Sequence, residues 1–380
     1  MNNNVLITGG AGFIGSNLAL RLINLGYNIT VLDNLSPQIH GENSVLYDSI
    51  KDKVRFIKGD IREKSDWLEA LKGQNIIVHL AAETGTGQSM YEVQKYVDVN
   101  VNGTSVLLDY LVNEEHSIIK VVVASSRAIY GEGKYFCEEH KEVYPKERIE
   151  ENLVKKDFEP KCPICNIDVA ICATDEESKI HPSSVYGITK QNQEQMVLNV
   201  CKSISVPAIA YRYQNVYGPG QSLKNPYTGI LSIFSTQIRN GNDINIFEDG
   251  NESRDFVFID DVVEATVLGI QNPDVCFDTF NVGSGVQTTV KQVAETLKKN
   301  YNSNVDINIS GDFRLGDIRH NFADLSKIKE KLDFTPQYSF EEGVDKFVKW
   351  VLSQEVHEDK YSNSIDEMKA KGLYKNSKDK

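Results

Sequence analysis

Two side chains at the start of a predicted helix, Tyr186 and Lys190, could act as a base and its cationic neighbour. Their spacing of four residues puts the phenol and the ammonium on one helical face. A phenol with a reference pKa of about 10 is a poor base at neutral pH, but a nearby positive charge favours the phenolate. The pair therefore predicts a tyrosine general base. Because Tyr-x-x-x-Lys also arises by chance in large chains, the assignment depends on its context.

A hydroxyl that could join this pair follows a predicted buried strand. Residues 121–124 are apolar and rich in valine, and Ser125 and Ser126 come directly after them. Ligands of open α/β sheets bind at the carboxyl ends of the strands. Ser126 is therefore predicted to lie at this edge of the sheet, beside a bound ligand.

A glycine-rich turn indicates that this ligand is a dinucleotide. Gly9, Gly12 and Gly15 lie between a predicted strand and a predicted helix, where glycine allows a tight turn and a close approach to a pyrophosphate. Asp33 ends the next predicted strand, 18 residues after Gly15. Its carboxylate would accept hydrogen bonds from the adenosine ribose and repel a 2′-phosphate, which favours NAD over NADP. A strand-end aspartate is also a common turn residue.

The elements that must position these residues follow an α/β pattern. Short apolar runs at residues 5–8, 28–33, 54–58, 75–80 and 118–124 alternate with helical patterns such as 13–25 and 99–111. Buried parallel strands joined by crossover helices produce this alternation. The predicted fold is a Rossmann-type doubly wound parallel sheet, with a smaller mixed α/β substrate domain at its carboxyl edge.

The domain boundaries follow from changes in this pattern. We expect an NAD-binding domain at residues 1–212, with an insertion at 132–181, and a substrate-binding domain at 213–354, from which some chain returns to the first domain. Residues 355–380 are rich in lysine and acidic residues, with few apolar anchors. They are predicted to be a polar tail, either a frayed helix or disordered.

Composition limits the partners of such a chain. Its 41 Lys and Arg against 54 Asp and Glu give a formal net charge of −13, which argues against nucleic acid and anionic membranes as partners. An anionic ligand would need a local positive pocket. No run approaches 18 consecutive apolar residues, and no basic leader or cleavage site is apparent, so a cytoplasmic protein is expected.

The insertion contains four of the six cysteines. Cys137 and His140 form one pair and Cys162 and Cys165 another, with 21 residues between the pairs. These spacings suit a tetrahedral structural zinc ion, which would fold a segment too polar to build its own core. An oxidised Cys162–Cys165 pair, or four unrelated surface residues, would also agree with the sequence.

The glycine-rich turn, the strand-end serine and the tyrosine-lysine helix, in this order, resemble the extended short-chain dehydrogenase/reductase family. Within it, they resemble the NAD-dependent nucleotide-sugar epimerases and dehydratases, over about residues 5–350. Residues 125–133 and the insertion resemble the dTDP-L-rhamnose 4-epimerase branch. Further matching segments are Asn100 to Thr104, Tyr130-Gly131, Arg212 to Pro219, Arg254 to Val257, and Arg314 to Asp317.

The resemblance implies a role for each matched residue. Tyr186 would be the general base, Lys190 would hold the nicotinamide ribose and lower the tyrosine pKa, and Ser126 would hydrogen-bond the reacting sugar oxygen. The partner would be a nucleotide-diphosphate sugar, and Arg254 and Arg314 would bind its diphosphate, because the guanidinium fork matches phosphate oxygens. A homodimer is also expected.

Two residue sets result. The predicted cofactor-binding residues are Gly9, Gly12, Phe13, Ile14, Gly15, Asp33, Asn34, Asp60, Ile61, Leu80, Ala81, Ala82, Asn100, Tyr186, Lys190 and Tyr213. The predicted substrate-binding residues are Glu83, Thr84, Ser126, Arg127, Asn215, Arg254, Arg314 and Asp317.

The type of reaction depends on three positions. Family members that eliminate water carry Thr-Asp-Glu where this chain has Ser126, Arg127 and Ala128, and related decarboxylases need a glutamate at the last of these. Of the family reactions, redox chemistry at a single carbon is then left. A 4-epimerase fits best: it oxidises the sugar, lets the 4-keto sugar rotate and reduces it again. An NAD(P)-dependent sugar reductase or dehydrogenase, or a non-catalytic NAD-sensing protein that binds a partner, would also be compatible.

Overall fold

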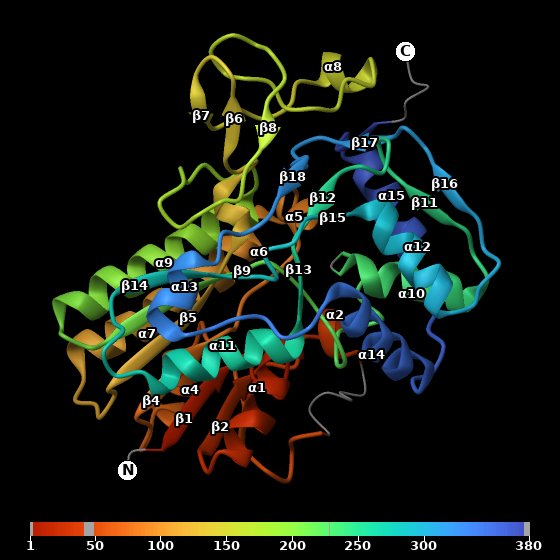
Figure 1. Cartoon of the computed structure of the whole chain (residues 1–380). Coiled ribbons are helices and arrows are strands. Elements are labelled where there is room, and N and C mark those ends of the chain that lie inside the picture. The colour runs from red at the N-terminus through yellow and green to blue at the C-terminus, as the bar shows by residue number, and fades with distance from the viewer. Residues whose placement is uncertain (1–2, 42–48, 228, 376–380) are drawn as a thin grey trace.

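The computed structural model describes residues 3–41, 49–227 and 229–375, and a seven-stranded sheet lies at its centre (Figure 1). Every neighbouring pair in this sheet is parallel, in the order β14-β9-β5-β4-β1-β2-β3. The order reverses between β1 and β4, so a crevice is expected at their carboxyl ends. The predicted doubly wound Rossmann-type sheet is confirmed. Its strands are β1 (Asn4–Thr8), β2 (Asn28–Asp33), β3 (Arg55–Lys58), β4 (Ile76–His79), β5 (Lys120–Ser126), β9 (Ala208–Tyr213) and β14 (Asp278–Val282).

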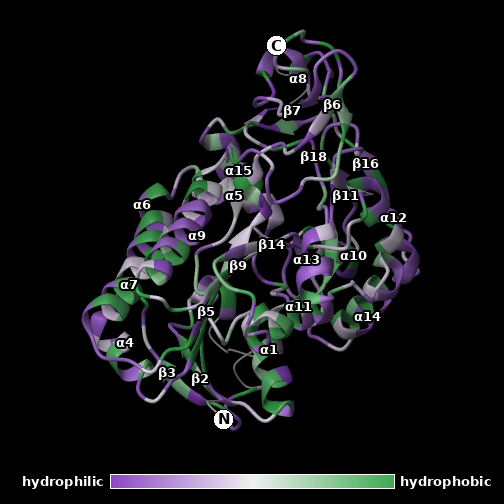
Figure 2. Cartoon of the chain, turned by 60° about the vertical axis from the view of Figure 1, so that its left-hand side comes forward, coloured by the Kyte–Doolittle hydropathy of each residue, from purple (hydrophilic) through white to green (hydrophobic). Residues whose placement is uncertain are grey.

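Helices cover both faces of the sheet, which is why β4, β5 and β9 are buried along their whole length. Side chains alternate along β1, so that Val5 and Ile7 lie in one core and Leu6 in the other. Figure 2 shows α4, α7 and α9 on one side of the sheet and α1 and α11 on the other. These helices are α1 (Phe13–Asn24), α4 (Lys64–Ala70), α7 (Gly103–Asn113), α9 (Val185–Ser203) and α11 (Ile259–Gln271).

The helix predicted over residues 99–111 is not uniform. It begins after α6 (Val93–Tyr96) with a π-helical stretch, Val97–Asn102, and only then continues as α7. A π-turn contains one residue more than an α-turn and so rotates the side chains that follow. Among the described residues, no helix combines the length and the apolar character needed to cross a bilayer.

A second lobe of small sheets and helices packs at the carboxyl edge of the central sheet (Figure 1). Its strand pairs are β10 (Asn215–Tyr217) with β13 (Phe256–Phe258), and β11 (Ile244–Ile246) with β16 (Ile307–Ile309). A further sheet joins β12 (Ser253–Arg254), β15 (Thr288–Thr289) and β18 (His320–Asn321). The helices of this part are α10 (Ile230–Asn240), α12 (Val290–Asn300), α13 (Ser326–Leu332) and α14 (Phe340–Leu352).

The chain after residue 355 differs from the predicted frayed or disordered tail. Residues Tyr361–Ala370 form a helix, α15, and β19 (Tyr374–Lys375) pairs antiparallel with β17 (Phe313–Arg314). Ile365, Met368 and Tyr374 are buried in a small core of their own. The tail prediction is therefore wrong for residues 361–375, because a few well-placed apolar side chains are enough to fix a helix against a preformed surface. Residues 376–380 lie outside the described residues.

Candidate active site

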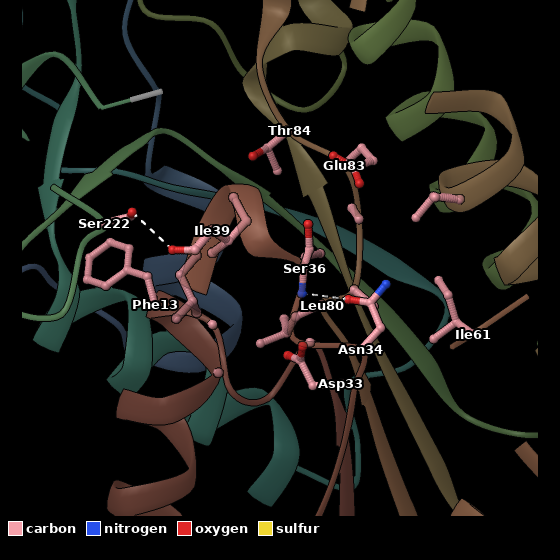
Figure 3. A pocket seen from close by; sticks show the side chains of 18 of the residues that line it. Phe13, Asp33, Asn34, Ser36, Ile39, Ile61, Leu80, Glu83, Thr84 and Ser222 are labelled. Atoms are coloured by element: carbon pink, nitrogen blue, oxygen red, sulfur yellow. Dashed lines mark hydrogen bonds between the residues drawn. The ribbon is translucent and has the colours of Figure 1, made fainter. Parts of the chain in front are cut away.

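A long groove crosses the carboxyl ends of the central strands, and nearly all the residues predicted to bind the cofactor line it. Figure 3 shows it from close by, with Asp33 and Asn34 at one side and Glu83 and Thr84 at the other. The predicted residues that line it are Gly9, Gly12, Phe13, Ile14, Gly15, Asp33, Asn34, Asp60, Ile61, Leu80, Ala81, Ala82, Tyr186, Lys190 and Tyr213.

The glycines shape the end of this groove. Gly9 has a φ of +66°, and a Cβ there would lie 2.8 Å from the Ala81 nitrogen. A Cβ on Gly15 would lie 2.5 Å from the Gly10 Cα, so glycine is needed for the helix to pack on the turn. Gly12 is the N-cap of α1, which has no capping side chain and no acidic residue in its first turn. The positive end of α1 therefore faces the groove, as a pyrophosphate requires.

Asp33 lies where a ribose would bind. Its Oδ2 accepts from the Ala11 N–H at 3.1 Å and its Oδ1 from the Leu35 N–H at 2.8 Å. Oδ2 keeps a further lone pair for a ribose hydroxyl, while His40 Nε2 lies 3.6 Å from Oδ1. The nearby Arg62 pairs with Asp60 and Asp98, both at 2.8 Å, instead of offering its charge to a 2′-phosphate. The groove thus fits NAD.

Asn100 is the one predicted cofactor ligand that does not line the groove. It is fully buried, its Oδ1 accepts from the Glu83 N–H at 2.7 Å, and its Nδ2 donates to the Glu83 carbonyl at 3.1 Å and to Thr189 Oγ1 at 2.9 Å. The structure places Asn100 behind the wall of the groove, where it fixes Glu83 and α9. The π-helical stretch that contains it turns the side chain in this direction.

The catalytic candidates Tyr186 and Ser126 lie where the cofactor groove opens into a second cavity, and both line both spaces. Ser184 caps α9 by accepting from the Gly187 N–H at 3.1 Å, and Ser89 Oγ accepts from the Tyr186 N–H at 3.0 Å. These bonds fix the first turn of α9, while Ser126 ends β5 as predicted. Two rigid elements therefore hold the hydroxyl and the phenol together.

The electrostatics of this pair differ in part from the prediction. Burial raises the pKa of Tyr186, while a hydrogen bond with Ser126 and the charge of Arg127 lower it. Lys190 was expected to supply this lowering. Its Nζ instead donates to Gln193 Oε1 at 2.7 Å, and burial lowers the pKa of Lys190 itself to about 7. Arg127 is thus the cation that lowers the pKa of Tyr186, but burial outweighs it and the pKa lies above the usual value of a tyrosine.

A buried network connects Lys190 to the sheet. Gln193 Nε2 donates to Thr104 Oγ1 at 2.9 Å, and His79 lies between Thr104 and Thr8, at 2.9 and 2.7 Å from their hydroxyls. Burial lowers the pKa of His79 to about 3, so its ring is neutral at physiological pH. The network fixes α9 to the ends of β1 and β4 beneath the groove.

The second cavity extends from Tyr186 and Ser126 into the second lobe and is rich in guanidinium groups. Its lining includes the predicted substrate residues Thr84, Ser126, Arg127, Asn215, Arg254, Arg314 and Asp317. Glu83, also predicted to bind substrate, lines only the cofactor groove.

The arginines of this cavity are held in different ways. Arg127 Nε donates to Asn215 Oδ1 at 2.7 Å, and Arg254 donates only to backbone carbonyl oxygens, at 2.7 to 2.9 Å. Arg314 pairs with Asp317 at 2.6 Å. Among the described residues no carboxylate pairs directly with Arg127 or Arg254, although Glu132 and Asp317 act on the charge of both, and these two guanidinium groups suit a diphosphate.

Comparison with known proteins identifies the family. The model of the NAD dependent epimerase/dehydratase family matches residues 5–151 and 168–283. The chain belongs to this family. It is 36% identical to dTDP-L-rhamnose 4-epimerase of Burkholderia thailandensis, over 92% of this chain and 95% of that protein.

Solved structures of related proteins have the same fold. UDP-glucose 4-epimerase of Thermotoga maritima, solved with UDP-glucose, has a TM-score of 0.75 at 28% identity and covers 92% of this chain and 98% of its own. The protein MoeE5, solved with UDP-glucuronic acid and NAD, has a TM-score of 0.73 at 26% identity and covers 92% and 99%. The predicted family, fold and enzyme class, an NAD-dependent nucleotide-sugar epimerase, are confirmed at the level of the family.

This member of the epimerase/dehydratase family lacks the carboxylates of the dehydratase pattern. Arg127 and Ala128 occupy the positions of the aspartate and the glutamate, and both line the second cavity. Neither can act as the acid or base of an elimination at neutral pH.

Some residues of the site were not predicted. Gln214 lines both cavities and is 5% exposed, yet neither its Nε2 nor its Oε1 has a partner among the described residues. Tyr361 and Met368 of α15 line the second cavity, although this segment was expected to be a tail. The sequence marks Gln214 only as part of a matching segment, and nothing in it marks α15.

The four predicted metal ligands, Cys137, His140, Cys162 and Cys165, also come together. Their ligand atoms all lie within 4.8 Å of one another. Cys137, Cys162 and Cys165 are free cysteines in this structure. None of the four lines the cofactor groove or the second cavity.

Proposed function

We propose that this protein is an NAD-dependent nucleotide-sugar 4-epimerase that acts on a dTDP-6-deoxyhexose such as dTDP-L-rhamnose. The observation that carries the proposal is the position of Tyr186 and Ser126 at the junction of a dinucleotide groove and an arginine-rich cavity. The identity of the sugar rests on the 36% identity to a dTDP-L-rhamnose 4-epimerase over nearly the whole chain.

Each residue of the junction has a defined task in such a reaction. NAD, when bound, would accept a hydride from the sugar C4 and return it. Tyr186 would remove the proton of the 4-hydroxyl, with Ser126 hydrogen-bonded to the same oxygen, and would return the proton once the other face is reduced. Arg254 and Arg314 would hold the diphosphate while the 4-keto sugar rotates in the cavity and presents its other face.

Two observations favour epimerisation over other family reactions. Arg127 and Ala128 leave the cavity without the carboxylates that elimination or decarboxylation would need. Asp33, 8% exposed in the groove, disfavours the 2′-phosphate of NADPH, which a net reductase would commonly use. An epimerase regenerates its NAD in every turnover and needs no second reductant.

The experiment is an assay of the purified full chain with dTDP-L-rhamnose, dTDP-glucose, UDP-glucose and UDP-glucuronic acid, without added reductant. NMR of the products should show inversion at C4 for a dTDP-6-deoxyhexose, with no net NADH. Accumulation of NADH would indicate a dehydrogenase, and turnover only with stoichiometric NADPH would indicate a reductase. A lack of turnover on every sugar, together with partner binding that depends on the NADH/NAD ratio, would support a sensor.

Three further predictions belong to this proposal. A homodimer through α7 and α9 is supported by the exposed apolar side chains Val112 and Ile188 on these helices, and light scattering of the eluted protein would test it.

A zinc ion in the insertion would have a structural role, since its candidate ligands line neither cavity. The cytoplasmic location stays a prediction.

A further inference from the structure

The insertion stands apart from the central sheet as a small lobe (Figure 1). Four side chains that could bind a metal, those of Cys137, His140, Cys162 and Cys165, come together inside it. Cys137 ends β6 (Tyr135–Cys137), and His140 lies in the turn to β7 (Lys141–Val143). Cys137 Sγ lies 3.6 Å from His140 Nδ1 and 3.7 Å from Cys165 Sγ, and Cys162 Sγ lies 3.6 Å from the same His140 nitrogen.

These separations match the edges of a tetrahedral zinc site. Zn–S bonds of about 2.3 Å and Zn–N bonds of about 2.0–2.1 Å place neighbouring sulfurs about 3.8 Å apart, and sulfur and nitrogen about 3.6 Å apart. A disulfide would instead bring two sulfurs to about 2.05 Å. Thiolates with one imidazole in this geometry select Zn²⁺. We infer that Zn²⁺ bound by Cys137, His140, Cys162 and Cys165 turns the insertion into a brace for the wall of the substrate cavity.

The part of the insertion around the four ligands has only a small core of its own, whereas Leu153 and Phe158 farther along the insertion pack on Phe313. Its three-stranded sheet consists of β6, β7 and the two-residue strand β8 (Ala170–Ile171). The fully buried members of its core are Tyr135, Val143 and two of the ligands, Cys137 and Cys162. So small a core does not stabilise a fold without a cross-link or a metal.

The chain between the two ligand pairs reaches the substrate cavity through Arg148. Its Nη1 donates to Glu248 Oε2 at 2.8 Å, and its Nη2 donates to the Asp317 carbonyl at 2.8 Å and lies 2.8 Å from Glu248 Oε1 as an ion pair. Glu248 and Asp317 both line the cavity, and Asp317 is the partner of Arg314. Arg148 therefore sets the position of the residues that are proposed to hold the diphosphate.

A second contact from the same segment strengthens this attachment. Glu159 accepts from Arg319 Nε at 2.9 Å and from Arg319 Nη2 at 2.7 Å. Arg319 is fully buried and donates to Glu248 at 2.9 Å. Residues 141–161 are thus fixed to the proposed metal site at both ends and to the cavity wall between them. Loss of the metal would free both ends of residues 141–161 and so loosen the cavity wall. The expected weakening of sugar binding rests on the proposed function.

The metal content of the purified, untagged full chain tests the site. Elemental mass spectrometry of protein produced with zinc and purified under reducing conditions should find about one zinc per chain. The C162S/C165S variant should retain less than about a tenth of this amount, whereas Cys172→Ser should retain all of it, because Cys172 lies in the insertion but outside the cluster. Zinc-free wild-type protein, another metal in place of zinc, or equal loss in Cys172→Ser would overturn the site.

The brace has its own test. Arg148→Met should retain zinc but raise the KM for the nucleotide sugar by about tenfold or more, with a smaller change in kcat, because a wall residue is displaced. C162S/C165S should show the same KM effect and faster proteolysis within residues 138–166. Unchanged KM and proteolysis in a folded, zinc-free variant would overturn the brace. Zinc content and proteolysis can be measured without any turnover. They therefore test the zinc site even if the chain proves not to be an epimerase.

Discussion

Arg127 donates from Nε to Asn215 Oδ1 at 2.7 Å, and this bond holds a guanidinium charge beside the Tyr186 phenol. Arg127 follows the end of β5, whereas Asn215 begins β10 in the second lobe, so the bond joins the two lobes at the catalytic junction. Burial lowers the pKa of Arg127 to about 9, which still leaves it cationic at neutral pH. Through Asn215, the second lobe thereby positions the Arg127 charge that acts on Tyr186, the proposed base.

Replacing Arg127 by methionine should shift the pH dependence of turnover. The guanidinium lowers the pKa of Tyr186, so its removal raises that pKa and leaves less phenolate at neutral pH. We expect the acidic limb of the kcat profile to move up by about one pH unit. Arg127→Lys keeps the positive charge and should therefore return most of the acidic limb toward the wild-type pH. A limb at the wild-type pH in Arg127→Met would show that Arg127 does not act on Tyr186.

Replacing Tyr186 by phenylalanine should remove catalysis and leave the fold intact. The change deletes the only atom proposed to move the substrate proton, and general base catalysis contributes about 10²–10⁴-fold. The change removes one hydroxyl from a side chain that lines both cavities, so the midpoint of thermal unfolding should change by only a few degrees. The measurement is kcat with the preferred nucleotide sugar, beside a thermal melt. Activity within tenfold of the wild type would exclude Tyr186 as the base.

The fold and the core of the site were predictable because short-range patterns encode them. Alternating apolar strands and helices dictate a parallel sheet, and such a sheet brings strand ends such as Ser126 and Asp33 to one edge. The pairs Cys137-x-x-His140 and Cys162-x-x-Cys165 encode a cluster for a similar reason, since each pair fits one tight turn.

The remaining features depend on contacts between distant segments, which local patterns do not contain. Residues 361–375 have few apolar side chains, and α15 is fixed by distant parts of the chain. Ile365 and Met368 pack on Tyr91 and Phe247, and Glu367 accepts from Tyr91 at 3.1 Å and from Tyr227 at 2.7 Å. The direction of the Asn100 side chain depends on a π-turn that no residue type signals. The Gln214 amide has no hydrogen-bond partner among the described residues because it lies where the two cavities meet, and only the folded chain brings these cavities together.

The buried Lys190 should make stability depend on pH. Burial lowers the pKa of Lys190 to about 7 in the folded chain, while an unfolded lysine keeps its proton up to about pH 10.4. Between these values the unfolded state binds more protons, so the free energy of unfolding rises with pH, by up to about 1.4 kcal/mol per unit. Lys190→Met should lose this rise, and Lys202→Met, an exposed change on the same helix, should keep it. Urea melts of nucleotide-free protein from pH 6.5 to 9.5 would measure the slopes, and equal slopes in wild type and Lys190→Met would refute the shift.

Gln214 offers a way to separate binding from folding. Its amide has no partner among the described residues, so Gln214→Leu removes no protein hydrogen bond and should change the free energy of unfolding by less than about 1 kcal/mol. Gln193→Leu is the matched control, because it breaks bonds to Lys190 and Thr104 and should cost about 1–3 kcal/mol. If Gln214 serves the ligands at the junction of the two cavities, its loss should instead weaken binding of the nucleotide sugar or NAD by about tenfold or more. Calorimetric titration with each ligand would identify which one depends on the amide. Unchanged affinity for both, with stability reduced as in Gln193→Leu, would make Gln214 a structural residue.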